Sequence, residues 1–243
     1  MTTITTAVTL VAYTIGFQTL IYLVLPNRFH RALAPAITGT VGTMIVVISA
    51  IWFGPDAVGL ANPDGGLLAA WGSGTVLLMS TVGLVMLARP PLRDHLADPR
   101  IASMTLRQAM AQIMVRIPVT TALIEEAVFR GVLHSALIVI YPEPVAMWAG
   151  AALFGLWHIG PGLQQARAVN RHSLAGVAHV LITVIGTTVA GAGLVWLRIE
   201  TGSIWVPLVV HAGVNMTMAI FARLAAGSSR IGLRHAEGVV QEG

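Results

Sequence analysis

Long apolar runs alternate with short polar segments along almost the whole chain. A helix needs about 20 mostly apolar residues to cross the hydrocarbon core of a bilayer. The pattern predicts seven membrane-spanning helices: 6–25, 32–53, 67–88, 118–140, 145–160, 174–197 and 203–224. The run at 145–160 is short for a span, which indicates a helix embedded among others. We therefore expect an all-α fold, a polytopic transmembrane helical bundle of about seven spans.

The segment 103–117 has a different pattern, with apolar and polar residues on opposite sides of a helix. Its apolar residues are Leu106, Met110, Ile113 and Ile117. Its polar residues are Thr105, Gln108, Gln112 and Arg116. Two interpretations remain open: an amphipathic helix that lies in the membrane interface, or the first turns of the next span. Pro118 is a natural place for a bend.

The span at 174–197 carries mostly small residues along one of its sides. These residues are Ala178, Ile182, Gly186 and Ala190. Small residues four apart let the backbones of two helices approach closely. We therefore expect this helix to pack closely against its neighbours.

Composition excludes a soluble protein, because only 10% of the 243 residues are charged and 56% are hydrophobic, whereas a soluble domain has about 25% charged residues. The absence of cysteine excludes disulfides, thiolate nucleophiles and Cys-ligated metals. The net charge of +4 does not indicate nucleic acid as a partner, because the arginines lie in short loops and the tail. Residues 1–27 contain no Lys or Arg, so we expect the first apolar segment to remain as a helix.

The charges between the predicted spans fall into two groups. Arginine-rich segments lie on one side: Arg28 and Arg31, 89–107, Arg167 and Arg171, and Arg223, Arg230 and Arg234. Mainly acidic segments lie on the other side: Asp56 and Asp64, Glu143, and Arg198 with Glu200. Cytoplasmic loops carry an excess of Lys and Arg. We therefore expect a multi-pass cell-membrane protein with its N-terminus outside and a flexible cytoplasmic tail at 225–243.

Three charged residues interrupt one apolar run, in the order Glu125, Glu126 and Arg130. Each charge at the centre of a membrane helix costs at least ~2.5–3.5 kcal/mol on insertion scales. Glu126 and Arg130 are four residues apart, in the favourable order for a helical ion pair. That pair leaves Glu125 unexplained, because this residue is about 100° away around the helix. Intramembrane ionisable groups mark functional sites by default, so this motif is the first candidate site.

Further polar residues lie within the last four predicted spans. We interpret His134 and His179 as hydrogen-bonded packing residues, the ordinary role of a lone histidine in a helix. His211 and Asn215 are four residues apart and therefore share a helix face. His158 lies four residues after Phe154. A carboxylate, two imidazoles and an amide that converge in a water-filled cavity would suit hydrolysis, with the carboxylate as base and the other groups as oxyanion donors.

These residues form three short motifs in separate apolar segments: Glu125-Glu126-x-x-x-Arg130-Gly131, Phe154-x-x-x-His158 and His211-x-x-x-Asn215. In this order they resemble the signature of the CPBP family. This family, also called Abi or CAAX-protease-and-bacteriocin-processing, includes the type II CAAX prenyl endopeptidases. The resemblance covers about residues 100–224. It implies a CPBP-like intramembrane protease core at 100–224, which follows the N-terminal transmembrane helices that the apolar pattern predicts at 1–99 and precedes the tail at 225–243.

The resemblance also implies a role for each motif residue. Glu125 would be the general base with His158 assisting at the attacking water, and His211 and Asn215 would form the oxyanion site. Glu126 and Arg130 would support this arrangement. The expected substrate is a membrane-associated protein or peptide, and the lipid bilayer is the expected surrounding.

A metal-dependent form of the same protease is an alternative, with Glu125, His158 and His211 as zinc ligands that leave an open position. We favour a site without a cofactor. The spacing of these residues is not that of a helical His-Glu-x-x-His motif, and Asn215 is a better oxyanion donor than zinc ligand.

Two other classes of function also fit an intramembrane cluster of Glu and His. A proton-coupled transporter would use them as a proton relay. The chain lacks the paired helices broken by Gly or Pro that usually indicate a transporter site. A non-catalytic immunity or scaffold protein on the same fold would need none of the motif residues.

Overall fold

The computed structural model describes residues 33–60, 62, 64–96, 98–168 and 174–241, together with the isolated positions 9 and 16. These residues form helices joined by short connections, and no β-strand occurs among them. The prediction of an all-α fold is confirmed. The span predicted at 6–25 lies outside the described residues except for positions 9 and 16.

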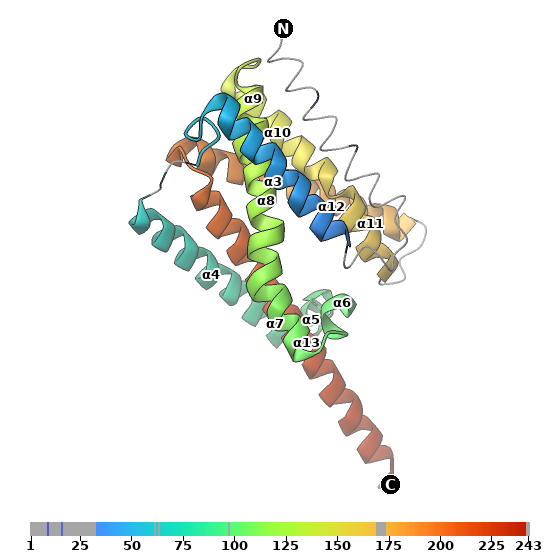
Figure 1. Cartoon of the computed structure of the whole chain (residues 1–243). Helices are drawn as coiled ribbons and strands as arrows, with labels where there is room; N and C mark the ends of the chain where they lie inside the picture. Colours follow the sequence, from blue (N-terminus) through green and yellow to red (C-terminus); the bar gives the residue numbers. More distant parts are fainter. Residues whose placement is uncertain are drawn as a thin grey trace.

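The helices of the described residues connect in chain order (Figure 1). They are α3 (Leu33–Phe53), α4 (Gly65–Ala88), α5 (Pro90–Leu96), α6 (Pro99–Ala102), α7 (Leu106–Ala111), η1 (Gln112–Ala122), α8 (Leu123–Glu126), η2 (Ala127–Leu133), α9 (His134–Leu137), α10 (Glu143–Trp157), α11 (Ile159–Ala168), α12 (Leu174–Thr201) and α13 (Trp205–Gln241).

Three helices of the described chain are long and apolar enough to cross a membrane. They are Gly65–Ala88, Leu174–Thr201 and Trp205–Gly227, and a shorter apolar helix covers Gly39–Phe53. The protein is therefore a helical membrane protein. The full set of seven spans stays a prediction.

A continuous helical rod from Leu106 to Leu137 runs through the centre of the described chain (Figure 1, green). It joins α7, η1, α8, η2 and α9. Its start is set by Thr105, which forms a reciprocal capping box with Gln108. Pro118 lies inside η1, whose wide π-type turns carry the chain past a residue that lacks a backbone N–H. Residues 106–117 are thus the first turns of the next helix, which decides between the two interpretations of the amphipathic segment.

Two long helix pairs flank the rod. Helix α10 packs along α12, and α13 packs along α4. Glycine permits both contacts, because a methyl group at Gly155 of α10 would overlap the side-chain oxygen of Thr188 and the Val184 carbonyl. A methyl group at Gly83 of α4 would likewise overlap the ring of Phe221. Small residues therefore bring the helices together, as membrane bundles require.

The packing side of α12 differs from the side on which the sequence pattern places small residues. The residues of that side, Ala178, Ile182, Gly186 and Ala190, are exposed. The face toward α10 instead contains Thr188 and Gly191. The predicted close packing of this helix is confirmed by its contacts with α10 and α11, but a different face makes them. Small and apolar residues occur on both sides of the helix, so the sequence pattern alone does not indicate which side packs.

Two connections are more helical than expected. The arginine-bearing segment between the spans predicted at 145–160 and 174–197 is not a simple loop, because 159–168 form α11, which packs against α12. Pro161 stands in the first turn, where its missing N–H costs nothing, and helix-forming Leu, Gln, Ala and Arg follow it. Helix α13 continues to Gln241 and does not end at Leu224. The flexibility of the segment 225–243 stays a prediction.

The loop at 54–60, between α3 and α4, folds back into the bundle. The carbonyl oxygen of Gly59, whose φ is +76°, accepts a hydrogen bond of 2.9 Å from the backbone N–H of Ile204. The carbonyl oxygen of Ala57 accepts one of 2.6 Å from the hydroxyl of Ser135 on α9. These bonds tie the loop to the rod and to the start of α13.

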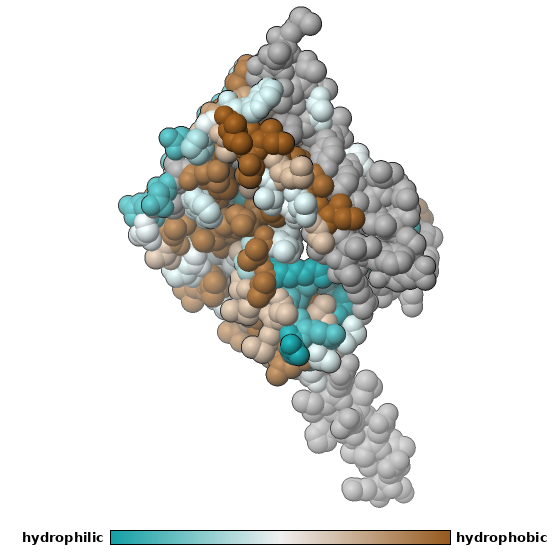
Figure 2. All heavy atoms as spheres, in the orientation of Figure 1, coloured by the Kyte–Doolittle hydropathy of each residue, from teal (hydrophilic) through white to brown (hydrophobic). Residues whose placement is uncertain are grey.

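Apolar side chains cover much of the outer surface. Figure 2 shows hydrophilic colours gathered around α5–α7 at the lower end and at the left edge near the start of α4, with hydrophobic residues over much of the face between them. Ile51, Leu77 and Ile182 are 75%, 71% and 71% exposed. An apolar surface of this extent fits a bilayer and not water.

The topology predicts which connections a membrane-impermeant thiol reagent reaches. Asn62 precedes α4 and Arg107 follows it, and both are exposed. In this cysteine-free chain, Asn62→Cys should label from outside intact cells and Arg107→Cys only after permeabilisation, because arginine-rich loops stay in the cytoplasm. Labelling of both positions from the same side would contradict the predicted orientation.

Candidate active site

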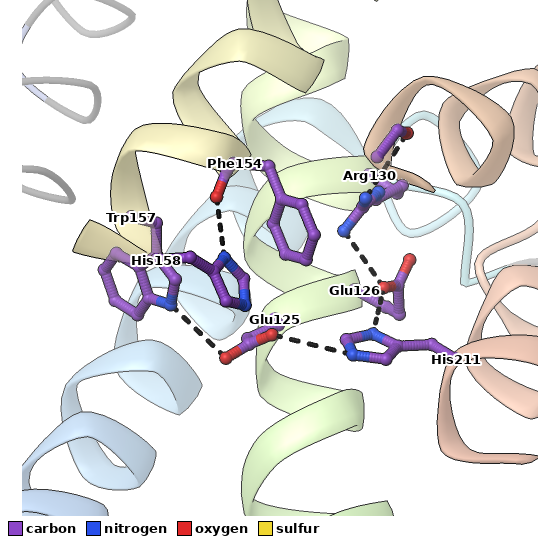
Figure 3. Close-up of polar contacts among 8 residues, drawn as sticks. Glu125, Glu126, Arg130, Phe154, Trp157, His158 and His211 are labelled. Atoms are coloured by element: carbon purple, nitrogen blue, oxygen red, sulfur yellow. Dashed lines mark hydrogen bonds and ion pairs between the residues drawn. The ribbon is translucent and has the colours of Figure 1, made fainter. Parts of the chain in front are cut away.

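A fully buried ion pair lies in the middle of the rod. Glu126 and Arg130 are both 0% exposed, and Nη1 of Arg130 donates a hydrogen bond of 3.0 Å to Oε1 of Glu126. Figure 3 shows the pair among the other polar side chains. The ion pair predicted from the four-residue spacing is confirmed.

Arg130 also joins the rod to the pair α10–α12. Its Nη2 donates a hydrogen bond of 3.4 Å to the carbonyl oxygen of Gly191 on α12. Its Cζ lies 4.0 Å from the centroid of the Phe154 ring on α10, in a cation–π contact. A methyl group at Gly191 would lie 3.0 Å from Phe154 and 3.4 Å from Nη2 of Arg130, so the absence of a side chain there lets the guanidinium approach.

His211 reaches the ion pair from α13. Its Nδ1 is 2.7 Å from Oε1 of Glu126, and its Nε2 is 3.8 Å from Oε2 of Glu125. An ionised carboxylate only accepts hydrogen bonds, so Nδ1 of His211 carries a hydrogen atom and donates a hydrogen bond to Glu126. The imidazole therefore stands between the two carboxylates, and Nε2 is the nitrogen on the Glu125 side (Figure 3).

Glu125 has a different environment from Glu126. Its side chain is 12% exposed, and Oε1 accepts a hydrogen bond of 3.3 Å from Nε1 of Trp157, on the last turn of α10. Within the described part of the chain, Oε2 is buried and has no hydrogen-bond partner. The sequence reasoning missed Trp157. Its position directly before His158, together with the need of a buried indole N–H for an acceptor, is the signal that could have indicated it.

His158 ends α10. It is half-buried, and its Nδ1 donates a hydrogen bond of 2.8 Å to the carbonyl oxygen of Phe154, which leaves Nε2 as the free ring nitrogen. The ring lies 4.6 Å from the ring of Phe154. In Figure 3 it points into the same space as Glu125 and His211. The structure thus brings the second motif to the first.

Asn215 is the predicted residue that the structure does not join to this network. It lies on α13 one turn after His211 and is half-buried. Its side chain makes no hydrogen bond within the described residues. His134 is buried in α9 and His179 is half-buried in α12.

Close packing explains why the last residue of the first motif, Gly131, is a glycine. The carbonyl oxygen of Val58, in the inserted loop at 54–60, lies against it, and a methyl group there would come within 2.9 Å of that oxygen. Val58 itself is 1% exposed. Glycine at this position therefore lets the loop cover the buried rod next to Arg130.

The alternative zinc ligands were Glu125, His158 and His211. Among the residues that the structure describes, no three side chains of His, Asp or Glu are gathered so that they could hold a metal ion together. Both histidines use Nδ1 in hydrogen bonds, to Phe154 and to Glu126, so Nε2 is the ring nitrogen of each that a metal would bind. The choice between a metal-free site and the zinc alternative stays a prediction.

Replacement of Arg130 should cost far more stability than replacement of Asn215. Arg130→Ala leaves the Glu126 carboxylate buried without its cation, at a cost of about 3–5 kcal/mol. Asn215→Ala removes a half-buried side chain without a hydrogen bond and should cost less than about 1 kcal/mol. Melting curves of the two purified variants in detergent measure the difference, and equal curves would contradict the structural role of Arg130.

The comparisons with known proteins agree with this geometry. Residues 107–217 match the family described as Rce1-like, type II CAAX prenyl endopeptidase. The match contains all three motifs and leaves α3 and α4 outside it. No curated protein and no solved structure matches the chain. Residues 107–217 therefore form an Rce1-like domain of the type II CAAX prenyl endopeptidase family, a family of membrane proteases, and the resemblance drawn from the motifs is confirmed.

Proposed function

We propose that this protein is an intramembrane endopeptidase that hydrolyses a peptide bond of a membrane-associated protein or peptide. The observation that carries the proposal is the unequal treatment of two adjacent carboxylates. Oε1 of Glu126 is held by Arg130 and His211 and its side chain is 0% exposed, whereas Glu125 has no ion pair with an arginine among the described residues and is 12% exposed. Oε2 of each carboxylate lacks a hydrogen-bond partner among these residues, but that of Glu125 lies 3.8 Å from Nε2 of His211. The Rce1-like family supports peptide-bond hydrolysis as the reaction.

Glu125 is the general base in this proposal. The water that attacks the scissile carbonyl gives one proton to Oε2, while its oxygen bonds to the carbonyl carbon. Oε2 suits this step because no donor among the described residues occupies it and because the Glu125 side chain is 12% exposed, whereas that of Glu126 is fully buried. His158 assists, because its free Nε2 can accept a hydrogen bond from the same water and orient it.

His211 stabilises the oxyanion that forms in this step. Its Nδ1–H is committed to Glu126, so Nε2 donates a hydrogen bond when the ring carries both protons. Glu126 stabilises that imidazolium, as a buried carboxylate does in a catalytic triad. Asn215 supplies a second donor from the next turn of α13. When the C–N bond breaks, the proton on Glu125 passes to the leaving amine.

Arg130 acts through Glu126 and not on the substrate. Its guanidinium neutralises the second carboxylate and stacks on Phe154, whose backbone carbonyl holds His158. One buried cation thereby orients both histidines. The spacing of Glu126 and Arg130 in the motif therefore serves to orient the two histidines of the proposed reaction.

The substrate class follows from where the site lies. The site residues belong to helices of a membrane bundle, so the scissile bond must reach them from the bilayer or its surface. The family name indicates a CAAX sequence, whose cysteine carries a prenyl group. We propose a membrane-associated substrate, processed in the cell membrane, with a prenylated CAAX peptide as the first probe.

Glu125→Gln should remove most of the turnover and leave folding nearly intact. Glutamine keeps the shape and still accepts the hydrogen bond from Trp157, but it cannot take a proton from water. Loss of the base should lower kcat by about 10²–10⁴-fold. The measurement is cleavage by purified protein of two quenched fluorescent peptides of one sequence, farnesylated or acyl-anchored.

Glu143→Gln is the matched control, because Glu143 is an exposed glutamate at the start of α10. It should cleave at the wild-type rate. If Glu125→Gln does the same, Glu125 is not the base. If wild-type protein cleaves neither peptide, a transporter or a non-catalytic membrane protein becomes the better proposal.

Activity should persist in excess chelator without added metal, because the proposed mechanism uses only side chains and water. The same two peptides are assayed before and after dialysis against EDTA, with an EDTA-inhibited zinc protease as the positive control. Loss of activity that zinc restores would support the metal-dependent alternative, with Glu125, His158 and His211 as the ligands to mutate first.

A further inference from the structure

Among the described residues, Trp157 is the side chain that donates a hydrogen bond to the proposed base. Its Nε1–H points to Oε1 of Glu125 at 3.3 Å, from a different helix. The indole is 8% exposed and stands edge-to-face on Phe129, with ring centroids 5.4 Å apart. Phe129 stands in the same way on Phe154, at 5.1 Å. An aromatic stack therefore holds the N–H in place.

We infer that Trp157 is a positioning residue for catalysis: its indole N–H holds Oε1 of Glu125 and so directs Oε2 at the reacting water. This inference rests on the proposed function. A carboxylate on a three-bond side chain rotates unless something holds it. The hydrogen bond to Oε1 leaves one orientation in which Oε2 is the oxygen beside Nε2 of His211, 3.8 Å away.

The arrangement divides the two oxygens of one carboxylate between two tasks. Oε1 is occupied by a donor that never reacts, since the indole N–H has no acid–base function near neutral pH. Oε2 keeps its lone pairs for the proton. A charge-assisted hydrogen bond of this kind is stronger than a neutral one. The same contact gives the buried N–H of Trp157 the acceptor that it needs.

Packing alone would place the indole but would not require its N–H. Trp157 belongs to the core cluster with Phe129 and Phe154, so loss of the ring also disturbs the core. The decisive variant therefore keeps the ring shape and removes only the donor. 3-Benzothienylalanine, in which sulfur replaces the N–H group, does this at position 157.

The expected result is a fall in kcat of roughly 10–100-fold for both the benzothienyl variant and Trp157→Phe, the range for loss of a hydrogen bond to a charged group. KM for the farnesylated or acyl-anchored peptide should change little, because the contact is with the base and not with the substrate. Trp148→Phe is the matched control, since Trp148 lies on the same helix and is 55% exposed. It should retain wild-type kcat.

A double-mutant cycle separates positioning from packing. If Trp157 acts through Glu125, the benzothienyl replacement should lower the residual rate no further in the Glu125→Gln background. A packing role would lower both backgrounds by the same factor. Equal factors, or a benzothienyl variant with wild-type kcat, would overturn the inference while the proposed function stands.

A readout without turnover tests the hydrogen bond itself. The chain has six tryptophans, and Trp157→Phe identifies one indole N–H resonance in the NMR spectrum by its loss. Glu125→Ala should move that resonance upfield, whereas Glu143→Ala should leave it in place. An unmoved resonance overturns the inference. Wild-type protein that cleaves neither peptide overturns the proposed function, and the positioning role with it.

Discussion

A carboxylate and a guanidinium that are both buried form the interaction on which the rest of this structure depends. Glu126 and Arg130 are fully inaccessible and lie one helical turn apart. Neither charge is tolerable alone inside a membrane bundle, and the free energy that each loses on leaving water must be recovered from the other. Their remaining bonding capacity reaches other helices, to Gly191 on α12 and to His211 on α13. The ion pair therefore determines where the rod, α12 and α13 meet.

The ion pair with Arg130 distinguishes Glu126 from its neighbour Glu125. Adjacent residues on a helix point about 100° apart, so Glu125 faces α10 while Glu126 faces Arg130 and α13. Glu126 accepts hydrogen bonds from a guanidinium and from a ring N–H, and within the described part of the chain Glu125 accepts one from the indole of Trp157 alone. Two identical side chains thereby receive environments suited to different tasks, which is the usual way in which a site separates a base from a supporting charge.

Close approach of backbones makes this geometry possible. Gly131 admits the loop carbonyl of Val58, Gly191 admits Arg130, and Gly155 lets α10 lie against α12. The π-type turns of η1 and η2 carry the rod past Pro118 and through the motif without a break. Apolar side chains alone would allow many rotations of these helices, since lipid solvates any apolar face. The glycines and the buried charges together limit the rotations at which these helices can pack.

The amino-acid sequence was sufficient to predict features that depend on a single helix. Apolar runs predicted α3, α4, α12 and most of α13, and the spacing of Glu126 and Arg130 predicted their ion pair, because helical geometry places residues four apart on one face. Only the tertiary structure decided which groups meet across helices. His211 bonds to Glu126 over 85 residues of chain, and Trp157 bonds to Glu125 over 32. These contacts depend on the rotation and height of each helix, which an apolar pattern does not encode, because lipid and a neighbouring helix attract the same residues.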